Sequence, residues 1–219
     1  MPDANNIQLI SFNEWTIRVR ASQAPAPRLL LLIHGWTGDE NSMWLFTRGL
    51  SPEYWMIAPR ASHAADPGGY SWRPPHPATF GRPSLEMLRP AAEGLIRLID
   101  EYSASVDLDA RQFDLMGFSQ GAALVNLVGM LYPHRIRKMC VLAGFVPSGL
   151  EAIIDRKPLA GKKVFVAHGT EDQMVPIDRA RASIKLLEKA GAQVAFCEDE
   201  VGHKLSAACR IALEGYLKD

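Results

Sequence analysis

The chain has 219 residues, of which 47% are hydrophobic and 22% are charged. This composition is that of an ordinary globular protein and excludes disordered, collagen-like and coiled-coil chains. The 24 Lys and Arg residues balance the 24 Asp and Glu residues, so no excess of positive charge indicates nucleic acid or an anionic membrane surface as a partner. The length predicts one domain over residues 1–219, or at most two small ones.

The amino-terminal stretch MPDANNIQLI has no basic segment followed by a long apolar one, so we expect no signal peptide. The longest strongly apolar run is Leu29–Ile33, far shorter than the roughly 18 residues that a membrane-spanning helix needs. We therefore expect a soluble cytoplasmic protein without integral membrane association. The sequence does not distinguish a monomer from a homodimer.

The three cysteines are Cys140, Cys197 and Cys209, and no C-x-x-C motif is present. The first two lie in strand-like segments and the third in a helix-like segment. This pattern indicates buried, reduced thiols and no Cys-rich zinc site. The six histidines show neither H-x-x-x-H nor H-x-H spacing, so we expect no metal and no organic cofactor.

Segments typical of strands alternate with segments typical of helices. The strand candidates are IQLISF and WTIRVRA within residues 7–21, then Leu29–Ile33, Trp55–Ala58, Phe113–Phe118, Lys138–Ala143, Lys163–His168 and Gln193–Glu198. The helix candidates are the segment with Ala91, Leu95, Leu98 and Tyr102 on one face, the apolar stretch Gln120–Tyr132, the segment that Pro176 opens and Gly191 closes, and the segment with Leu205, Cys209, Ala212 and Tyr216. The alternation predicts an α/β fold with a mostly parallel central sheet and helices on both faces.

Two connections between the predicted strands and helices could cover a binding site. The roughly twenty residues between the strands that end near Ala143 and begin near Lys163 can form one short helix within Val146–Arg156. No large lid domain is therefore expected. The other connection, residues 60–84, is a long loop with five prolines and three glycines, and long loops inside compact domains are often functional.

The aromatic residues Tyr70, Trp72 and Phe80 of this loop have two interpretations. They either line an acyl groove or pin the loop to the core, and the sequence favours neither. We assign substrate binding to Tyr70, Trp72 and Met174. Because prolines stiffen the loop, we expect a groove that is partly preformed and is not opened by a lipid interface. Without a lid the groove should be shallow and bury few methylenes, so we expect a preference for short-to-medium acyl chains.

The motif that carries chemistry is GFSQG, which spans Gly117–Gly121 and fits G-x-S-x-G. It follows a predicted strand and precedes a predicted buried helix, the context that this motif requires. Glycines flank Ser119 because the turn is too tight for larger side chains. The amino terminus of the helix presents N–H groups where negative charge would develop. We therefore predict that Ser119 is a nucleophile.

A nucleophilic serine needs a histidine base and an acid that orients this base. When the serine lies on a strand–turn–helix motif of this kind, the acid follows it in the chain and the histidine comes last. His168 ends a predicted strand, and Glu171 and Asp172 follow on the loop at its carboxyl end, where catalytic groups collect in α/β sheets. After Asp172 the only remaining histidine is His203, which we predict to be the base. The acid is Asp172 or Glu171, since Asp178 is expected to cap the following helix.

The oxyanion hole should combine the N–H after the nucleophile, that of Gln120, with an N–H from the loop after the first buried strand. That loop is HGWTG, residues 34–38. We choose the N–H of Trp36 as the second donor, with that of Thr37 as the alternative. His34 is expected to support the loop structurally.

Four motifs, IHGWTGDE, MGFSQGAAL, HGTEDQMVP and VGHKLS, occur in this order within residues 28–217. Together they resemble the phospholipase/carboxylesterase branch of the α/β-hydrolases, which includes the acyl-protein thioesterases. The resemblance implies an α/β-hydrolase fold with a triad of Ser119, Asp172 and His203. It further implies that the N–H groups of Trp36 and Gln120 form the oxyanion hole.

The expected function is that of a serine carboxylesterase or thioesterase that hydrolyses small acyl esters or thioesters through an acyl-enzyme. One alternative is another serine hydrolase on the same fold, such as a lysophospholipase, peptidase or lactonase. A second alternative, a non-catalytic binding protein, would be expected to lack part of the triad or the oxyanion glycines, and none of these is missing.

Overall fold

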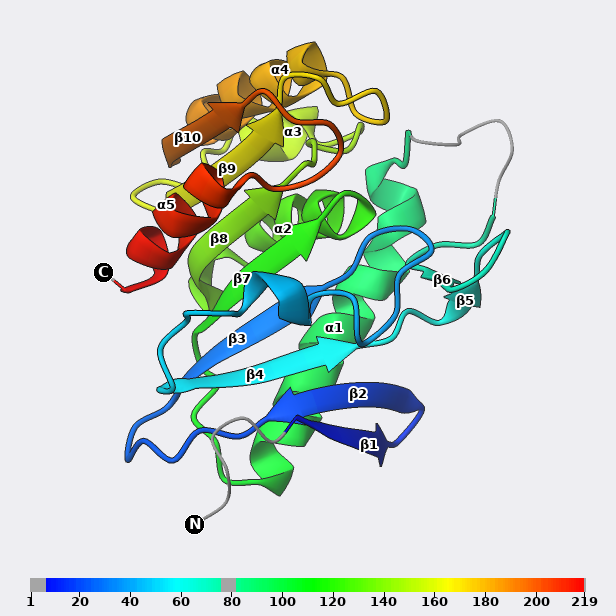
Figure 1. The fold of residues 1–219 in the computed structure, drawn as a ribbon, viewed down its shortest axis with the longest axis vertical. Helices are drawn as coiled ribbons and strands as arrows, with labels where there is room; N and C mark the ends of the chain where they lie inside the picture. Colours follow the sequence, from blue (N-terminus) through cyan, green and yellow to red (C-terminus); the bar gives the residue numbers. More distant parts are fainter. Residues whose placement is uncertain (1–6, 76–81, 219) are drawn as a thin grey trace.

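The computed structural model describes residues 7–75 and 82–218. At its centre lies an eight-stranded sheet with the strand order β1-β2-β4-β3-β7-β8-β9-β10 (Figure 1). Its strands are β1 (Gln8–Phe12), β2 (Trp15–Arg20), β3 (Arg28–Ile33), β4 (Tyr54–Pro59), β7 (Phe113–Phe118), β8 (Ile136–Leu142), β9 (Lys163–Gly169) and β10 (Gln193–Asp199). A small separate sheet pairs β5 (His63–Ala64) with β6 (Tyr70–Ser71).

Most neighbours in the large sheet are parallel, as predicted. β1 and β2 form the antiparallel hairpin expected from residues 7–21, and β2 pairs antiparallel with β4. All other neighbouring strands of this sheet run parallel. β3 lies inside the sheet, and its residues Leu29–Ile33 are all buried. Both faces of β3 are covered, which explains its continuous apolar sequence.

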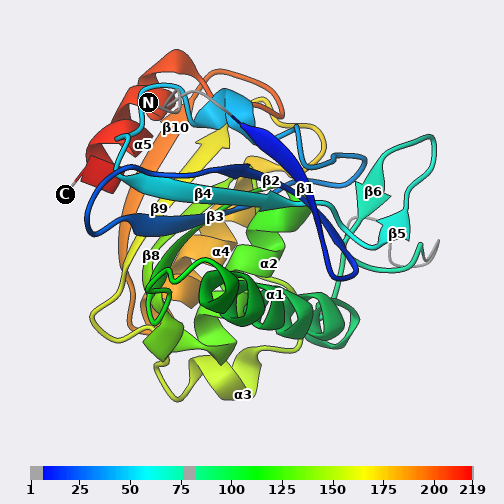
Figure 2. The ribbon, with the colours of Figure 1, turned by 90° about the horizontal axis from the view of Figure 1, so that it is seen from below.

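Helices cover both faces of the sheet, which Figure 2 shows from below. α1 to α4 lie on one face, and α5 and η1 lie on the other. Side chains alternate accordingly: Leu31 packs in the apolar cluster with α1 and α2, and Leu30 and Leu32 pack in the cluster with α5. The elements are α1 (Leu85–Ser105), α2 (Gln120–Leu131), α3 (Glu151–Ile154), α4 (Ile177–Lys189), α5 (Ala207–Lys218), and the 3-10 turns η1 (Trp44–Phe46) and η3 (Pro133–Arg135).

Two helices differ in detail from the sequence-based expectation. α5 buries Cys209, Leu213 and Leu217, and Leu205 and Tyr216 pack against the same apolar cluster. Of the predicted apolar face, only Ala212 is exposed. α4 begins after an N-cap at Pro176, and Asp178 lies within its first turn. Asp178 is therefore not the cap, although a carboxylate in the first turn still interacts favourably with the helix dipole.

The chain between β8 and β9 contains one short helix, α3. This confirms that no large lid domain is inserted there. In the described ranges, no helix is both long enough and apolar enough to cross a bilayer.

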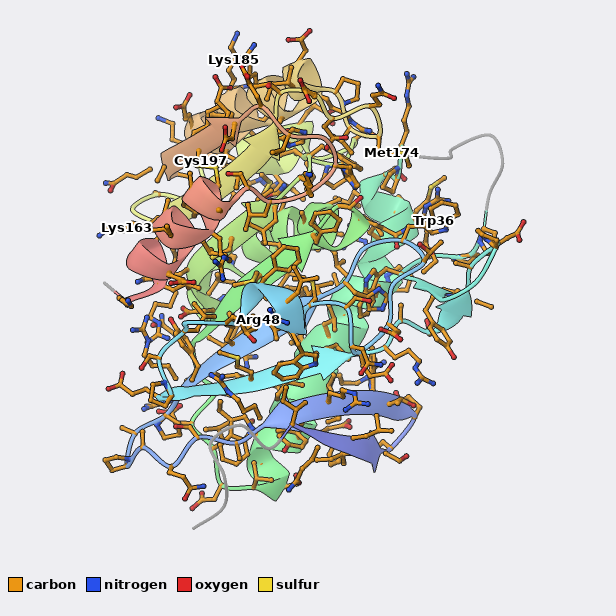
Figure 3. All side chains as sticks on the ribbon, in the orientation of Figure 1. Trp36, Arg48, Lys163, Met174, Lys185 and Cys197 are labelled. Carbon is orange, nitrogen blue, oxygen red and sulfur yellow. A yellow bond between two sulfur atoms is a disulfide. The ribbon has the colours of Figure 1, made fainter. Side chains whose placement is uncertain are left out.

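The prediction of three reduced thiols is wrong for two of them. Cys197 of β10 and Cys209 of α5 form a disulfide, and Cys140 is a free, buried cysteine. Figure 3 shows Cys197 beside the ribbon of α5. The two cysteines meet because α5 packs against β9 and β10 at one edge of the sheet. The spacing of the cysteines in the sequence does not show this packing.

Candidate active site

Ser119 lies at a strained turn between β7 and α2. Its φ of 54° and ψ of −115° are unusual for a residue with a side chain. Backbone hydrogen bonds hold it there: the Ser119 N–H donates to the carbonyl of Leu142 at 2.9 Å, and the Ser119 carbonyl accepts from the N–H of Ala123 at 3.1 Å. A turn of this form raises the serine side chain at the carboxyl edge of the sheet.

The flanking glycines are required by close backbone contacts. A Cβ at Gly117 would lie 2.4 Å from the carbonyl oxygen of Gly121, and a Cβ at Gly121 would lie 2.1 Å from the carbonyl oxygen of Ile33. Both positions therefore exclude any larger residue without a backbone shift. The G-x-S-x-G spacing thus records the geometry of the turn.

Asp172 and His203 meet at the carboxyl ends of β9 and β10. The Nδ1 atom of His203 lies 2.6 Å from Oδ2 of Asp172. The Oδ1 atom of Asp172 accepts the backbone N–H groups of Met174 and Val175, each at 2.9 Å. Asp172 is 5% exposed, so its carboxylate is both fixed and shielded from water.

His203 is also placed beside the serine turn. Its ring centroid lies 4.9 Å from that of Phe118, the residue before Ser119. Glu171, the alternative acid, is exposed, and its N–H donates to the carbonyl of Val201. The structure therefore pairs His203 with Asp172.

The loop after β3 lies against the serine turn. A Cβ at Gly35 would lie 3.3 Å from Cβ of Ser119. The N–H of Thr37 donates to the carbonyl of Tyr70 at 3.0 Å. That N–H is therefore engaged within the protein and does not face a substrate oxygen.

His34 is buried within this loop. Its Nδ1 lies 2.7 Å from the carbonyl oxygen of Gly35, and its Nε2 accepts the N–H of Ala61 at 3.1 Å. Burial lowers the pKa of His34, so the neutral ring is favoured. Both ring nitrogens serve the backbone, which fits the structural role expected of it.

The side chain of Gln120 has a role that the sequence did not indicate. Its Oε1 accepts the backbone N–H of Trp72 at 2.9 Å, and its Nε2 donates to Oγ of Ser71 at 3.1 Å. Trp72 is 2% exposed, and its Nε1–H donates to the carbonyl of His34 at 2.8 Å. These contacts anchor the long loop to the serine turn.

A cavity of about 790 Å³ opens beside Ser119. Figure 3 shows Trp36 and Met174, which both line it, at the same edge of the molecule. The described residues that line it are Trp36, Asp66, Ser71, Arg73, Pro74, Pro75, Arg82, Pro83, Ser119, Gln120, Phe145, Gln173, Met174, Val175, Pro176 and Arg179.

The cavity bears on the two interpretations of the loop aromatics. Met174 lines the cavity, but Tyr70 and Trp72 are not among its described lining residues. The structure thus favours loop anchoring over groove lining for Trp72. Phe80 lies outside the described residues. The arginines of this cavity were not predicted, because no local pattern brings Arg73, Arg82 and Arg179 together.

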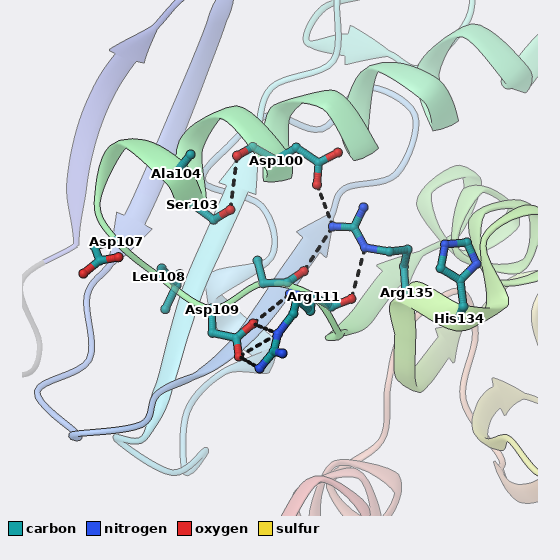
Figure 4. A pocket seen from close by; sticks show the side chains of 10 residues that line it. Asp100, Ser103, Ala104, Asp107, Leu108, Asp109, Arg111, His134 and Arg135 are labelled. Carbon is teal, nitrogen blue, oxygen red and sulfur yellow. Dashed lines mark hydrogen bonds and ion pairs between the residues drawn. The ribbon is translucent and has the colours of Figure 1, made fainter.

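A second cavity, of about 520 Å³, lies at the opposite edge of the sheet, before β7 and β8 (Figure 4). Both of its arginines pair with aspartates: Arg135 lies 2.6 Å from Asp100, and Arg111 lies 2.7 Å from Asp109. It contains none of the residues predicted for catalysis. Within residues 7–75 and 82–218, no group of three or more His, Cys, Asp or Glu residues is arranged to hold a metal ion.

Comparisons with known proteins show which family the chain matches. The phospholipase/carboxylesterase family matches residues 16–209. Acyl-protein thioesterase 1 of Debaryomyces hansenii is 28% identical over 196 residues, which cover 80% of this chain and 82% of that protein. A carboxylesterase of Arabidopsis thaliana is 33% identical over 107 residues, which cover 48% of this chain and 46% of that protein.

A solved structure shows the same fold. The crystal structure of a carboxylesterase from Mesorhizobium loti superimposes with a TM-score of 0.83 at 21% identity, covering 97% of this chain and 99% of that one. The family match extends over most of the chain, including the serine turn and the loops of Asp172 and His203. The chain therefore belongs to the phospholipase/carboxylesterase family and is a serine hydrolase with the α/β-hydrolase fold.

Proposed function

We propose that this enzyme hydrolyses short-to-medium acyl esters or thioesters with Ser119 as nucleophile, His203 as base and Asp172 as the acid that orients the base. One observation carries the proposal. The strained turn at Ser119 lines the cavity, and His203, which Asp172 holds, lies against Phe118, the residue before Ser119.

The first half of the reaction is acylation. His203, held through Nδ1 by Asp172, takes the Ser119 hydroxyl proton on Nε2 while the serine oxygen bonds to the substrate carbonyl carbon. The carbonyl oxygen becomes an oxyanion, which the N–H groups of Trp36 and Gln120 stabilise. The bond to the leaving oxygen or sulfur then breaks, and His203 donates its proton to the departing alcohol or thiol.

The second half is hydrolysis of the acyl-enzyme. His203 removes a proton from a water molecule as that water attacks the acyl carbon. The bond to Ser119 breaks, the serine oxygen regains the proton from His203, and a carboxylic acid leaves. Each turnover therefore consumes one ester or thioester and one water, and the enzyme is restored.

The shape of the site supports short-to-medium acyl chains. The short connection between β8 and β9 inserts no lid domain over the cavity beside Ser119, so we expect a long acyl chain to remain partly outside it. Each buried methylene contributes about 0.8 kcal/mol. We expect no jump in rate at a lipid interface, and a continuous gain out to long-chain triglycerides would overturn this part of the proposal.

Labelling with a fluorophosphonate probe tests the nucleophile. The wild type should be labelled, and Ser119→Ala should lose the label and lower kcat by roughly 10⁴-fold or more while remaining folded. Ser105→Ala, at an exposed position at the end of α1, is the matched control and should behave as the wild type. Label or near-normal esterase activity in Ser119→Ala would overturn the assignment.

A substrate panel, used together with the labelling, separates the alternative functions. A panel of esters, thioesters, lysophospholipids, lactones and peptides distinguishes the proposed activity from that of another serine hydrolase on this fold. A non-catalytic binding protein would be folded yet remain unlabelled and inactive on the whole panel.

The cytoplasmic location expected from the sequence stays a prediction. The disulfide between Cys197 and Cys209 speaks against it, because disulfides persist in oxidising compartments and are rare in the cytosol.

A further inference from the structure

The cavity beside Ser119 has an excess of positive charge. Three arginines line it, Arg73, Arg82 and Arg179, and Asp66 is the one carboxylate among its described lining residues. The chain as a whole has no net charge, so the positive charge at this cavity is a local feature of the site.

Arg179 is held at the cavity although its surroundings disfavour a cation. It lies in the first turn of α4, where the helix dipole is positive and stabilises anions instead. Burial, and after it the positive charge of Arg82, lower the pKa of Arg179 to about 10. The guanidinium carbon lies 3.4 Å from the ring centroid of Phe145, a contact that positions the group without neutralising it.

Arg73 adds a second desolvated cation. It is 6% exposed, its Nη1 donates to the carbonyl of Pro74 at 3.3 Å, and burial lowers its pKa. A second helix amino terminus borders the cavity, because α2 begins at Gln120, which also lines it. Two helix amino termini and three guanidinium groups therefore converge on one space.

The cavity at the opposite edge of the sheet has a different balance of charge, because three aspartates and two arginines are among its described lining residues. There, Arg135 and Arg111 are each within 2.7 Å of an aspartate (Figure 4). Among the described residues that line the cavity beside Ser119, the arginines outnumber the carboxylates by three to one. An anion bound in this cavity would relieve the repulsion between Arg82 and Arg179.

We propose that the substrate of this site carries, besides its ester or thioester group, a carboxylate or phosphate group that Arg82 and Arg179 bind, with Arg73 adding to the positive field. The inference rests on the proposed function and names its substrate class: small anionic esters or thioesters. Guanidinium groups suit this task because their planar N–H donors match the oxygens of both anions.

Two matched substrate pairs test the inference. The mono-para-nitrophenyl ester of adipate is compared with para-nitrophenyl hexanoate, which differs only by a methyl group in place of the carboxylate. Hexanoyl thioesters of mercaptopropionate and of propanethiol place the charge on the leaving group instead. We expect kcat/KM to be at least about ten-fold higher for the anionic member of one pair, and this ratio to fall with added salt. Ratios of one or below in both pairs would overturn the inference.

Variants identify the responsible arginines. Arg179→Gln and Arg82→Gln should each lower the anionic-to-neutral ratio by about five-fold or more. Arg181→Gln is the matched control, since Arg181 lies on the same helix but pairs with Glu198 at 3.0 Å and does not line the cavity. It should leave the ratio unchanged. An equal fall of the ratio in Arg181→Gln would indicate a general charge effect and contradict the inference.

A binding measurement separates the two proposals. Adipate and inorganic phosphate are titrated into Ser119→Ala by calorimetry, with and without Arg179→Gln. Binding that Arg179→Gln weakens supports the anion site even if no ester is cleaved, and the comparison of the two anions distinguishes carboxylate from phosphate. Ester cleavage without charge preference and without anion binding would leave the proposed function standing and overturn this inference.

Discussion

The Oε1 atom of Gln120 accepts the backbone N–H of Trp72 at 2.9 Å. This bond joins the residue after the nucleophile to the middle of the long loop. Trp72 continues the connection, since its indole N–H donates to the carbonyl of His34. The loop, the serine turn and the proposed oxyanion loop therefore form one connected unit.

Trp72 should consequently matter for stability. Trp72→Ala removes a nearly fully buried indole, and such truncations cost about 3–5 kcal/mol. Trp72→Phe keeps most of the apolar area but leaves the His34 carbonyl without its donor, which costs about 1–3 kcal/mol. Urea unfolding measures both. Tyr70→Phe is the control and should change the free energy of unfolding less than Trp72→Phe; the reverse order would contradict the anchoring role.

Exchange of the two neighbouring acids tests which one orients the base. Asp172→Asn should lower kcat on the order of 10³–10⁴-fold, because an amide cannot stabilise the protonated ring of His203. Glu171→Gln should keep near-normal kcat, since Glu171 is exposed and contacts Val201 through its backbone. Steady-state kinetics of both variants decide the matter, and a comparable loss in Glu171→Gln would count against Asp172.

Acid should destabilise the protein through its buried histidines. Burial lowers the pKa of His34 and of His168 below the ordinary value of 6.5. Between that value and the lowered pKa the unfolded chain binds more protons, so the free energy of unfolding falls as the pH drops below about 6.5. Protonation would also place a hydrogen on Nε2 of His34, which already accepts the N–H of Ala61.

Urea unfolding between pH 5 and pH 8 measures this dependence. His34→Gln and His168→Gln should each show a shallower pH dependence than the wild type. His134→Gln removes an exposed histidine and serves as the control. An identical slope in all four proteins would show that the buried histidines do not carry the effect.

The disulfide predicts how many thiols react with a thiol reagent. Denatured, unreduced protein should react with one equivalent of a thiol reagent, at Cys140, and reduced protein with three, because Cys197 and Cys209 are joined. Native protein should react slowly, since Cys140 is fully buried and burial raises the pKa of its thiol. Three reactive thiols without reductant would show that the bond does not form in the isolated protein.

The sequence by itself determined the parts of this protein that depend on local patterns. The continuous apolar runs predicted the parallel strands, because strands covered on both faces have no polar side. The glycines around Ser119 predicted the tight turn, because contacts of 2.1 and 2.4 Å exclude a Cβ. The chain order of acid and histidine led to His203, which the structure places 2.6 Å from Asp172.

Only the tertiary structure decided the features that depend on contacts between distant segments. Trp72 turns into the core because Gln120 and His34, far away in the chain, supply its hydrogen-bond partners. Cys197 meets Cys209 because α5 packs against β9 and β10 at one edge of the sheet. The arginines of the cavity come from the long loop and from α4. No local pattern identifies these residues, because the direction of a side chain in a loop depends on the packing around it.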